Sequence, residues 1–334
     1  MASSHHFDVQ RKRIQRKFPG GYRLMVNADM CKSFHHMALA VLVLNKHGVR
    51  EPHWHPNADE LIYCAEGKAL VTLFSPENTH DTFTLNEGEV AYFPKGYLHH
   101  IENISPHPCR FIIAYDHPNP QDLDLSQTTT SMSPHVLAKT FGASEQKFKK
   151  LKARDTFISR SSTKPPIGLV TNPNKFNLER INPQIDTPGG SARIVNNKNF
   201  PKLKKLALFS LRLKKNGIRE PHWHPNADEL NYVIKGKARL TILSPGGKKE
   251  TFELKPGQGS IIPAGYFHHI ENIGAGELHM TVYFSNPDPD DIGLSGALSA
   301  YSNGILASTF STGEKFFKDL PHFEEDRMIV AGGG

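Results

Sequence analysis

The sequence predicts an all-β protein made of two tandem jelly-roll (double-stranded β-helix) barrels, each repeat ending in short C-terminal helices. Three observations support this fold class. The chain repeats itself at a fixed offset, each repeat reads as a series of short strands, and 334 residues suit two domains of about 150 residues.

The internal repeat is visible in two motifs. The segment REPHWHPNADEL begins at Arg50 and again at Arg219, an offset of 169 residues. The same offset relates Gly96 to Gly265, each of which opens a GYxHHIENI segment. The repeated unit runs from about 19 to 150 and from about 188 to 319. A tandem duplication explains this pattern, and we expect domains at 1–165 and 166–334.

Within a unit, short β-rich runs are separated by Pro and Gly. In the second half these runs are 206–213, 238–243, 251–254 and 259–263. Many short strands with Gly/Pro turns indicate antiparallel sheets closed into a jelly roll. Helical spacing of apolar residues predicts a helical stretch at 134–152 and at 303–320. The polar segment 153–187 is interpreted as an inter-domain arm.

Composition excludes several classes of protein. No apolar run approaches the 18 or so residues needed to span a bilayer, and the basic N-terminus lacks a secretory signal, so we expect a soluble, cytoplasmic protein without membrane contacts. The cysteines, three in number and without a CxxC pair, predict neither disulfides nor a thiolate zinc site. The net charge of +7, richest at 11–17, is interpreted as solvated surface, not as a nucleic-acid site. His5 and His6 are expected in a disordered arm.

The histidines carry the strongest functional signal. Residues two apart on a strand face the same side, so His53 and His55 point together, and the turn Pro-Asn-Ala-Asp lets Glu60 return on the neighbouring strand. His99 follows a Pro-x-Gly turn. The predicted ligands are His53, His55, Glu60 and His99 in the first half, and His222, His224, Glu229 and His268 in the second. Chance clustering is disfavoured because the spacing occurs twice, and this donor set suits Mn²⁺ or Fe²⁺ more than structural zinc.

These residues resemble the two motifs of the cupin family. His53-x-His55-x4-Glu60-x6-Gly67 resembles the first motif, and Gly88-x5-Pro94-x-Gly96-x2-His99-x3-Asn103 resembles the second; both recur 169 residues later. The glycine before the first histidine pair, Gly48 or Gly217, lies one residue closer than usual. The whole chain is most similar to bicupins of the oxalate decarboxylase type.

That resemblance implies two Mn²⁺ sites, with Fe²⁺, Zn²⁺ or Ni²⁺ as other possible ions, and a small carboxylate substrate such as oxalate. It implies dioxygen-dependent cleavage of the carbon–carbon bond or oxidation to CO₂ and peroxide. Arg50 and Arg219 match an arginine that grips the substrate carboxylate. Strict strand parity would turn both outward, into surface Arg–Glu pairs, unless Pro52 and Pro221 mark a bulge that re-aims them.

The lid glutamate of the oxalate decarboxylases has no match in this chain. The candidates to replace this acid are Asp122, Asp124, Asp290 and Asp291, which could equally be turn or N-cap residues. Asn103 and Asn272 are expected to fix a turn.

Two other classes of function stay open beside the enzyme that we favour. One is a non-catalytic storage or sugar-binding bicupin, against which the complete ligand sets count. The other is an iron dioxygenase acting on an aromatic acid, although Glu60 and Glu229 favour manganese. The resemblance also implies a homo-oligomer assembled through the terminal helices.

Overall fold

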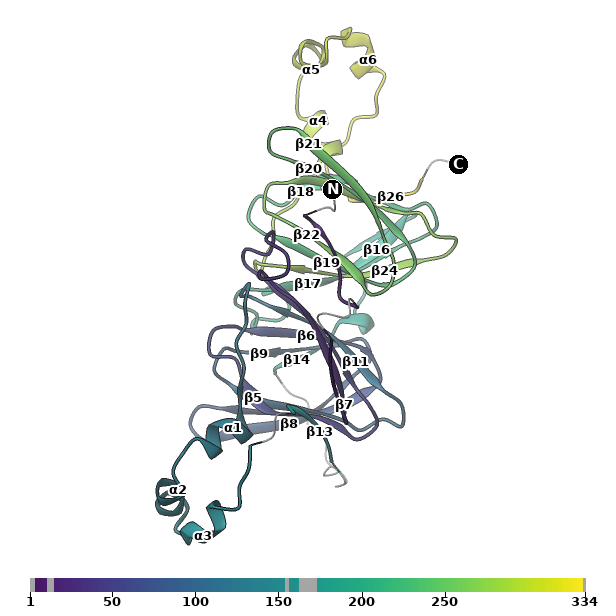
Figure 1. Ribbon diagram of the computed structural model, residues 1–334. Coiled ribbons are helices and arrows are strands. Elements are labelled where there is room, and N and C mark those ends of the chain that lie inside the picture. The colour runs from purple at the N-terminus through teal and green to yellow at the C-terminus, as the bar shows by residue number, and fades with distance from the viewer. Residues whose placement is uncertain (1–3, 11–14, 154–155, 162–172, 333–334) are drawn as a thin grey trace. The chain divides into compact units, whose positions relative to one another are not determined.

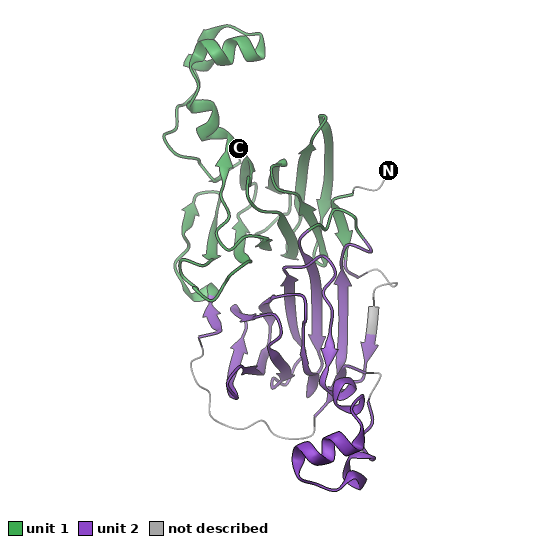
Figure 2. Ribbon diagram, turned by 90° about the vertical axis from the view of Figure 1, so that its left-hand side faces the viewer, with its two compact units in different colours: residues 1–8, 31–35, 178–334 green, residues 9–30, 36–177 purple. Residues whose placement is uncertain are grey.

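The computed structural model of the protein divides into two compact units, coloured separately in Figure 2. The N-terminal unit comprises 9–30 and 36–177, and the C-terminal unit comprises 1–8, 31–35 and 178–334. The structure describes residues 4–10, 15–153, 156–161 and 173–332. Each unit contains two antiparallel sheets, as expected for a jelly roll.

The N-terminal unit pairs a seven-stranded with a six-stranded sheet. In spatial order, the first contains β14 (Lys175–Asn177), β9 (Glu89–Phe93), β6 (Glu60–Glu66), β11 (Cys109–Tyr115), β4 (Ala38–Leu44), β3 (Gly21–Val26) and β2 (Gln15–Phe18). The second contains β12 (Leu123–Asp124), β5 (Gly48–Trp54), β10 (Leu98–Asn103), β7 (Lys68–Ser75) and β8 (Thr79–Asn86), with β13 (Ile158–Arg160) also pairing β5.

The C-terminal unit repeats this arrangement. Its seven-stranded sheet contains β1 (His6–Asp8), β22 (Gln258–Ile262), β19 (Glu229–Lys235), β24 (Leu278–Phe284), β17 (Ala207–Leu213), β16 (Gly190–Val195) and β15 (Ile185–Thr187). Its six-stranded sheet contains β21 (Lys248–Leu254), β20 (Ala238–Ser244), β23 (Phe267–Asn272), β18 (Ile218–Trp223) and β25 (Ile292–Gly293), with β26 (Ile329–Val330) also pairing β18. A 3₁₀ turn, η2 (Leu178–Arg180), precedes β15.

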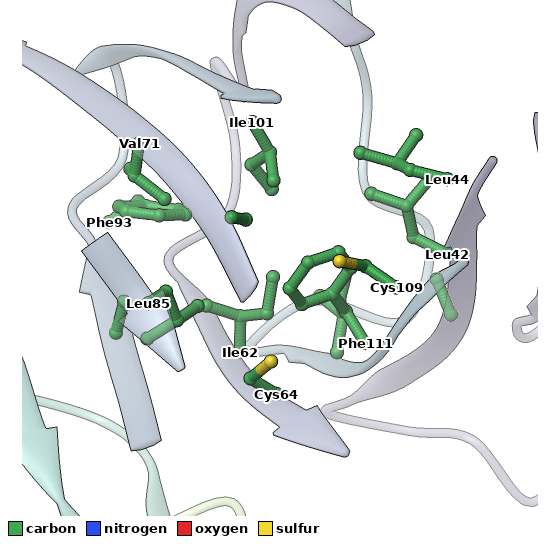
Figure 3. Close-up of a cluster of buried hydrophobic side chains, with 14 of the residues drawn as sticks. Leu42, Leu44, Ile62, Cys64, Val71, Leu85, Phe93, Ile101, Cys109 and Phe111 are labelled. Atoms are coloured by element: carbon green, nitrogen blue, oxygen red, sulfur yellow. The ribbon is translucent and has the colours of Figure 1, made fainter. Parts of the chain in front are cut away.

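Alternate strand residues from both sheets of the N-terminal unit fill one hydrophobic core. Leu42, Ile62, Val71 and Phe111 belong to it and are fully or almost fully buried (Figure 3). Burying each such side chain stabilises the fold by roughly 1.5–3 kcal/mol. The equivalent core of the C-terminal unit draws on strands of both of its sheets. The two sheets of each unit therefore form a sandwich with a packed hydrophobic interior.

Short helices follow the last long strand of each unit. They are α1 (Leu125–Thr130), α2 (Pro134–Phe141), α3 (Glu145–Phe148), α4 (Leu294–Ser299), α5 (Asn303–Phe310) and α6 (Glu314–Lys318). Figure 1 shows each trio as an excursion from the sheets of its own unit. The predicted stretches at 134–152 and 303–320 are helical but not continuous, because Gly142 and Ser311 adopt left-handed conformations that end α2 and α5. Among the described residues no helix is long and apolar enough to cross a membrane.

The short strands β1 and β14 precede the two repeats in the sequence, and each pairs with a strand of the opposite repeat. β1 pairs β22 of the C-terminal unit, whereas β14, its counterpart 169 residues later, pairs β9 of the N-terminal unit. The expectation of a disordered arm at His5 and His6 is therefore wrong: His5 Nδ1 lies 2.9 Å from the carbonyl of Ile261. The segment 153–187 likewise contributes strands. The predicted boundary at 165/166 lies outside the described residues, as do 11–14 of the basic cluster.

Candidate metal centre

Strand ends and tight turns position the first set of predicted ligands. His53 lies near the end of β5, Glu60 opens β6, and His99 on β10 pairs directly with His53. Asp59 holds the intervening turn, because its carboxylate accepts hydrogen bonds from the Tyr92 hydroxyl (2.6 Å) and the Lys95 amide (2.7 Å). The local fold thus brings the ligands together from three strands.

The four predicted ligands of the N-terminal unit converge in a buried cluster. Their ligand atoms all lie within 4.8 Å of one another. Glu60 Oε2 is 2.7 Å from His55 Nε2 and 3.5 Å from His99 Nε2. His99 Nε2 is buried without a hydrogen-bond partner. A buried nitrogen without a donor, beside a carboxylate and two further imidazoles, fits a divalent cation.

Backbone carbonyls fix how these imidazoles face. A carbonyl can only accept, so each contacted Nδ1 carries the proton and leaves Nε2 as the donor atom for a metal. His53 Nδ1 contacts the Glu51 carbonyl at 2.8 Å, and His55 Nδ1 contacts that of Gln121 at 2.9 Å. His99 Nδ1 contacts the Tyr97 carbonyl at 2.9 Å. The ligand set is thereby preorganised.

The C-terminal unit contains an equivalent buried cluster. His222, His224, Glu229 and His268 are buried, and their ligand atoms also lie within 4.8 Å of one another. Glu229 Oε2 is 2.9 Å from His224 Nε2 and 3.1 Å from His268 Nε2. All three Nδ1 atoms contact backbone carbonyls at 2.6–2.8 Å. The eight predicted side chains therefore form two equivalent sets.

The electrostatics of the sets favour a bound positive charge. Burial by itself lowers the pKa of His55, but the hydrogen bonds and charges of Asp122 and Glu60 raise it to about 9. Burial by itself raises the pKa of Glu60, but His55 and His99 lower it to about 2. Burial, together with the charge of Arg219, lowers the pKa of His222 to about 3. Ionised Glu60 therefore attracts a proton onto His55 at neutral pH, and a divalent cation bound by this set would replace that proton.

A bulge turns the predicted arginines inward. The pairing of β5 with β10 shifts register between Arg50 and His53, and that of β18 with β23 shifts between Arg219 and His222. Each shift adds one residue to the stretch between the arginine and the histidine, which contains Pro52 or Pro221, a residue that cannot donate to the ladder. Arg50 and Arg219 are consequently 2% and 7% exposed, so they are not surface Arg–Glu pairs.

Carboxylates after the last long strand meet these arginines. Arg50 contacts Asp124 at 2.6 Å and Asp122 at 3.2 Å. Arg219 pairs with Asp291 and donates to the Met328 carbonyl at 3.0 Å. Asp290 points elsewhere, because its side chain accepts from Asn226 at 2.8 Å.

Of the four lid-acid candidates, three therefore form ion pairs with an arginine. Burial by itself raises the pKa of Asp122, but Arg23, His55 and Arg50 hold it well below its usual range. In the C-terminal unit three of the four ligands line one cavity together with the arginine and Asp291; these ligands are His222, His224 and Glu229.

Comparison with known proteins shows which family has this architecture. Residues 19–149 and 176–316 match the family model described as Cupin. The chain belongs to the cupin family. The match occurs once in each repeat, so this cupin is a bicupin, and the strand motifs identified from the sequence lie inside the matched regions.

Several relatives of this cupin are oxalate decarboxylases by name. A probable oxalate decarboxylase of Arthroderma benhamiae is 31% identical over 331 residues, which cover 94% of this chain and 80% of that protein. The oxalate decarboxylase of Bacillus subtilis is 26% identical over 309 residues, covering 89% and 80%. A solved structure of the Bacillus enzyme aligns with a TM-score of 0.89 at 25% identity, covering 100% of this chain and 89% of that one.

Three side chains near the cupin sites were not predicted from the sequence. Arg23 contacts Asp122, Tyr115 packs edge-on against His55 with ring centroids 4.9 Å apart, and Asn231 donates to Glu229 Oε1 at 2.7 Å. Their counterparts in the other repeat are Ala192, Phe284 and Ile62. These positions differ between the repeats, so a comparison that looks only for residues shared by the two repeats misses them. The signal that could have found them is a difference between the repeats inside otherwise matching strands.

Proposed function

We propose that this bicupin is a metal-dependent enzyme of the oxalate decarboxylase type, with Mn²⁺ in two sites and a small carboxylate, oxalate in the first instance, as substrate. The observation that carries the proposal is the pairing of each buried ligand set with one buried arginine. The names of the relatives support the substrate, and manganese is supported by a study of the Mn(II) centres of the Bacillus subtilis enzyme.

The residues of each site have two roles, metal binding and substrate binding. A metal ion held by the three imidazoles and the glutamate would supply Lewis acidity and one-electron chemistry. Arg50 or Arg219 would hold an anionic oxygen of the substrate in a buried setting, where a charged hydrogen bond is strong. In the C-terminal site, apolar side chains such as Phe209 and Phe284 line the cavity and would limit the access of water to the substrate.

Whether oxalate yields formate and CO₂ or is oxidised to two CO₂ depends on whether the site supplies a proton. Cleavage of oxalate to CO₂ and formate consumes one proton at the new formate carbon, whereas oxidation releases two CO₂ and passes electrons to dioxygen. Asp122 and Asp291 are ionised partners of the arginines, so we propose that they neutralise the arginine rather than supply this proton. The ion pairs favour peroxide formation as a second activity beside decarboxylation.

A product assay of the metal-loaded protein tests the proposal. Mn²⁺-reconstituted protein is incubated with oxalate in air, and formate, CO₂ and peroxide are quantified. We expect formate, peroxide or both from wild type, and loss of at least 100-fold in Glu60→Gln/Glu229→Gln. Glu66→Gln, on an exposed position of β6, is the matched control and should keep wild-type rates. Absence of every product from fully loaded wild type would exclude the proposal.

We further propose that the chain assembles as a homo-oligomer through the helices α1–α3 and α4–α6. Among the described residues, six of the fourteen large exposed apolar side chains lie in these helices, including Phe141, Phe310 and Phe316. Exposed apolar clusters of this kind mark protein–protein contacts. A cytoplasmic location stays a prediction.

A further inference from the structure

The N-terminal site contains a second arginine beside the expected one. Arg23 Nη1 lies 2.6 Å from Asp122 Oδ2, and Arg50 Nη2 lies 3.2 Å from the same oxygen. Both guanidinium groups also lie against the ring of Phe157, at 4.6 and 4.7 Å from its centroid. Two fixed guanidinium groups thus converge on one carboxylate oxygen.

This carboxylate lies next to the metal ligands. Asp122 Oδ1 is 3.1 Å from Nδ1 of His55, whose Nε2 faces Glu60. Tyr115 packs edge-on against His55, and burial together with the charge of Glu60 raises the pKa of its hydroxyl. The arginine pair and the ligand set therefore belong to one site.

The C-terminal site lacks the second arginine. Ala192 occupies the position of Arg23, and it lines the cavity together with Arg219, His222 and Glu229. The remaining wall is largely apolar and includes Phe209, Phe284, Met328 and Ile329. The repeats have thus kept the same ligand set and diverged in the charge placed around it.

We propose that Arg23 and Arg50 form a carboxylate clamp that makes the N-terminal site selective for dianionic dicarboxylates, and that Asp122 occupies this clamp until substrate displaces it. A dicarboxylate can present one carboxylate to the metal ligands and the other to the clamp. The C-terminal site, with Arg219 alone among apolar side chains, discriminates far less between a dicarboxylate and a monocarboxylate. This inference rests on the proposed function and names the specificity of one of its two sites.

The charges explain why an exchange is favourable only for a dianion. Arg23 and Arg50 face Asp122 and Asp124, so the cluster is electrically balanced as it stands. A substrate carboxylate replaces Asp122 between the two guanidinium groups without loss of an ion pair. A monocarboxylate that binds at the metal has no second carboxylate to offer, and Asp122 then stays in place.

Equilibrium binding to single sites tests the clamp. Oxalate and glycolate, in which a hydroxymethyl group replaces one carboxylate, are titrated calorimetrically into Mn²⁺-loaded protein without oxygen. Glu229→Gln confines metal to the N-terminal site and Glu60→Gln to the C-terminal site. The measured quantity is the oxalate-to-glycolate affinity ratio. We expect Arg23→Gln to lower this ratio about 10- to 100-fold at the N-terminal site, the usual effect of losing a charged hydrogen-bond partner.

Two further variants keep the test decisive if Arg23→Gln loses its fold or metal. Ala192→Arg should raise the ratio at the C-terminal site, and Asp122→Asn should tighten oxalate binding at the N-terminal site because the competing carboxylate is gone. An unchanged ratio in Arg23→Gln, or in Ala192→Arg where the first variant does not fold, overturns the clamp while leaving the proposed function intact. Failure of both sites to bind either acid overturns the proposed function itself.

Discussion

Each ligand histidine uses its two ring nitrogens for different tasks. Nδ1 donates to a backbone carbonyl, and Nε2 faces the shared glutamate. For His53 and His99 the carbonyl acceptors, those of Glu51 and Tyr97, lie two residues before the histidine, whereas His55 uses the distant carbonyl of Gln121. The ring direction is therefore set by the backbone, partly within the strand that supplies the ligand and partly by the segment after β11.

Removing one glutamate should empty one site only. We expect Glu60→Gln and Glu229→Gln each to retain about one of two metal equivalents, because the two sets share no residue and a neutral amide is a poor ligand for a hard cation. Elemental analysis after dialysis measures this. Glu66→Gln should retain both equivalents, and full occupancy in Glu60→Gln would show that the glutamate is not a ligand.

Outside the metal sites, His279 should make the fold sensitive to acid. Burial, together with the charge of Arg212, lowers its pKa to about 4, below the value of about 6.5 for an unfolded chain. The unfolded chain thus takes up the extra proton first, so this contribution to stability is full above about pH 6.5 and is lost as the pH falls toward 4.

Replacing His279 tests that dependence. Between pH 7 and 4.5 the free energy of unfolding should fall by about 1–3 kcal/mol less in His279→Gln than in wild type. Urea unfolding at both pH values provides the comparison, with His80→Gln at an exposed position as control. Equal losses in wild type and His279→Gln would contradict the prediction.

The sequence predicted the metal ligands better than the residues around them. Strand parity and repetition were sufficient for all eight ligands, because these residues obey a local rule and occur twice. The inward direction of Arg50 required a bulge, which Pro52 suggested and which only strand pairing could establish. Arg23 lies on another strand, and nothing in its neighbours along the chain indicates what it contacts.

At the scale of the strands and turns, one asparagine joins two connections in each unit. Asn103 Nδ2 lies within hydrogen-bond distance of the carbonyls of Leu44, Asn45 and His107 at 2.9, 3.1 and 2.8 Å. Asn272 makes the equivalent contacts in the C-terminal unit. The expected turn-fixing role is confirmed, and it ties the loop before β5 to the loop after β10, the two strands that carry His53 and His99.

Truncating Asn103 should destabilise the N-terminal unit. Asn103→Ala leaves buried carbonyls without a donor, and we expect a loss of about 2–4 kcal/mol in unfolding free energy. Chemical unfolding followed by circular dichroism measures it, and Asn272→Ala should show a loss of similar size. A loss below about 0.5 kcal/mol, within the range of ordinary surface changes, would assign the turn to other contacts.

The elements themselves were partly predictable. Short strands, turns and terminal helices follow from residue patterns within a few positions of one another. The break between α2 and α3 was missed because the apolar spacing continues across Gly142, whereas the backbone turns left-handed there. The pairing of β1 was missed because three residues contain too little pattern to identify an edge strand.

At the scale of the whole molecule, the short helices bury few of their side chains within their own unit, and α1, α3 and α4 bury none. Phe310 and Phe316 are each 58% exposed. Short helices without a large buried face gain little stability alone. A second copy of the chain would cover these side chains, which is the physical reason for the assembly proposed above.

Charged substitutions in the helices should reduce the size of the assembly. We expect Phe310→Asp/Phe316→Asp to shift the molar mass toward that of a single chain, because burying two carboxylates in an apolar contact is unfavourable. Light scattering during size-exclusion chromatography measures the mass. Phe74→Asp, at a 39% exposed position on β7, is the control and should retain the wild-type mass. A wild-type chain that is already monomeric would contradict the proposed assembly.

The reciprocal pairing of β1 and β14 has a consequence for how the molecule arose and how it can be cut. Two copies of a single repeat could complete each other's sheets by exchanging this strand, as β1 and β14 do here. An end-to-end fusion of such a pair would give the pairing seen in the present chain. Expression of 178–334 alone would accordingly leave β22 as a bare edge, prone to capture any extended peptide within reach.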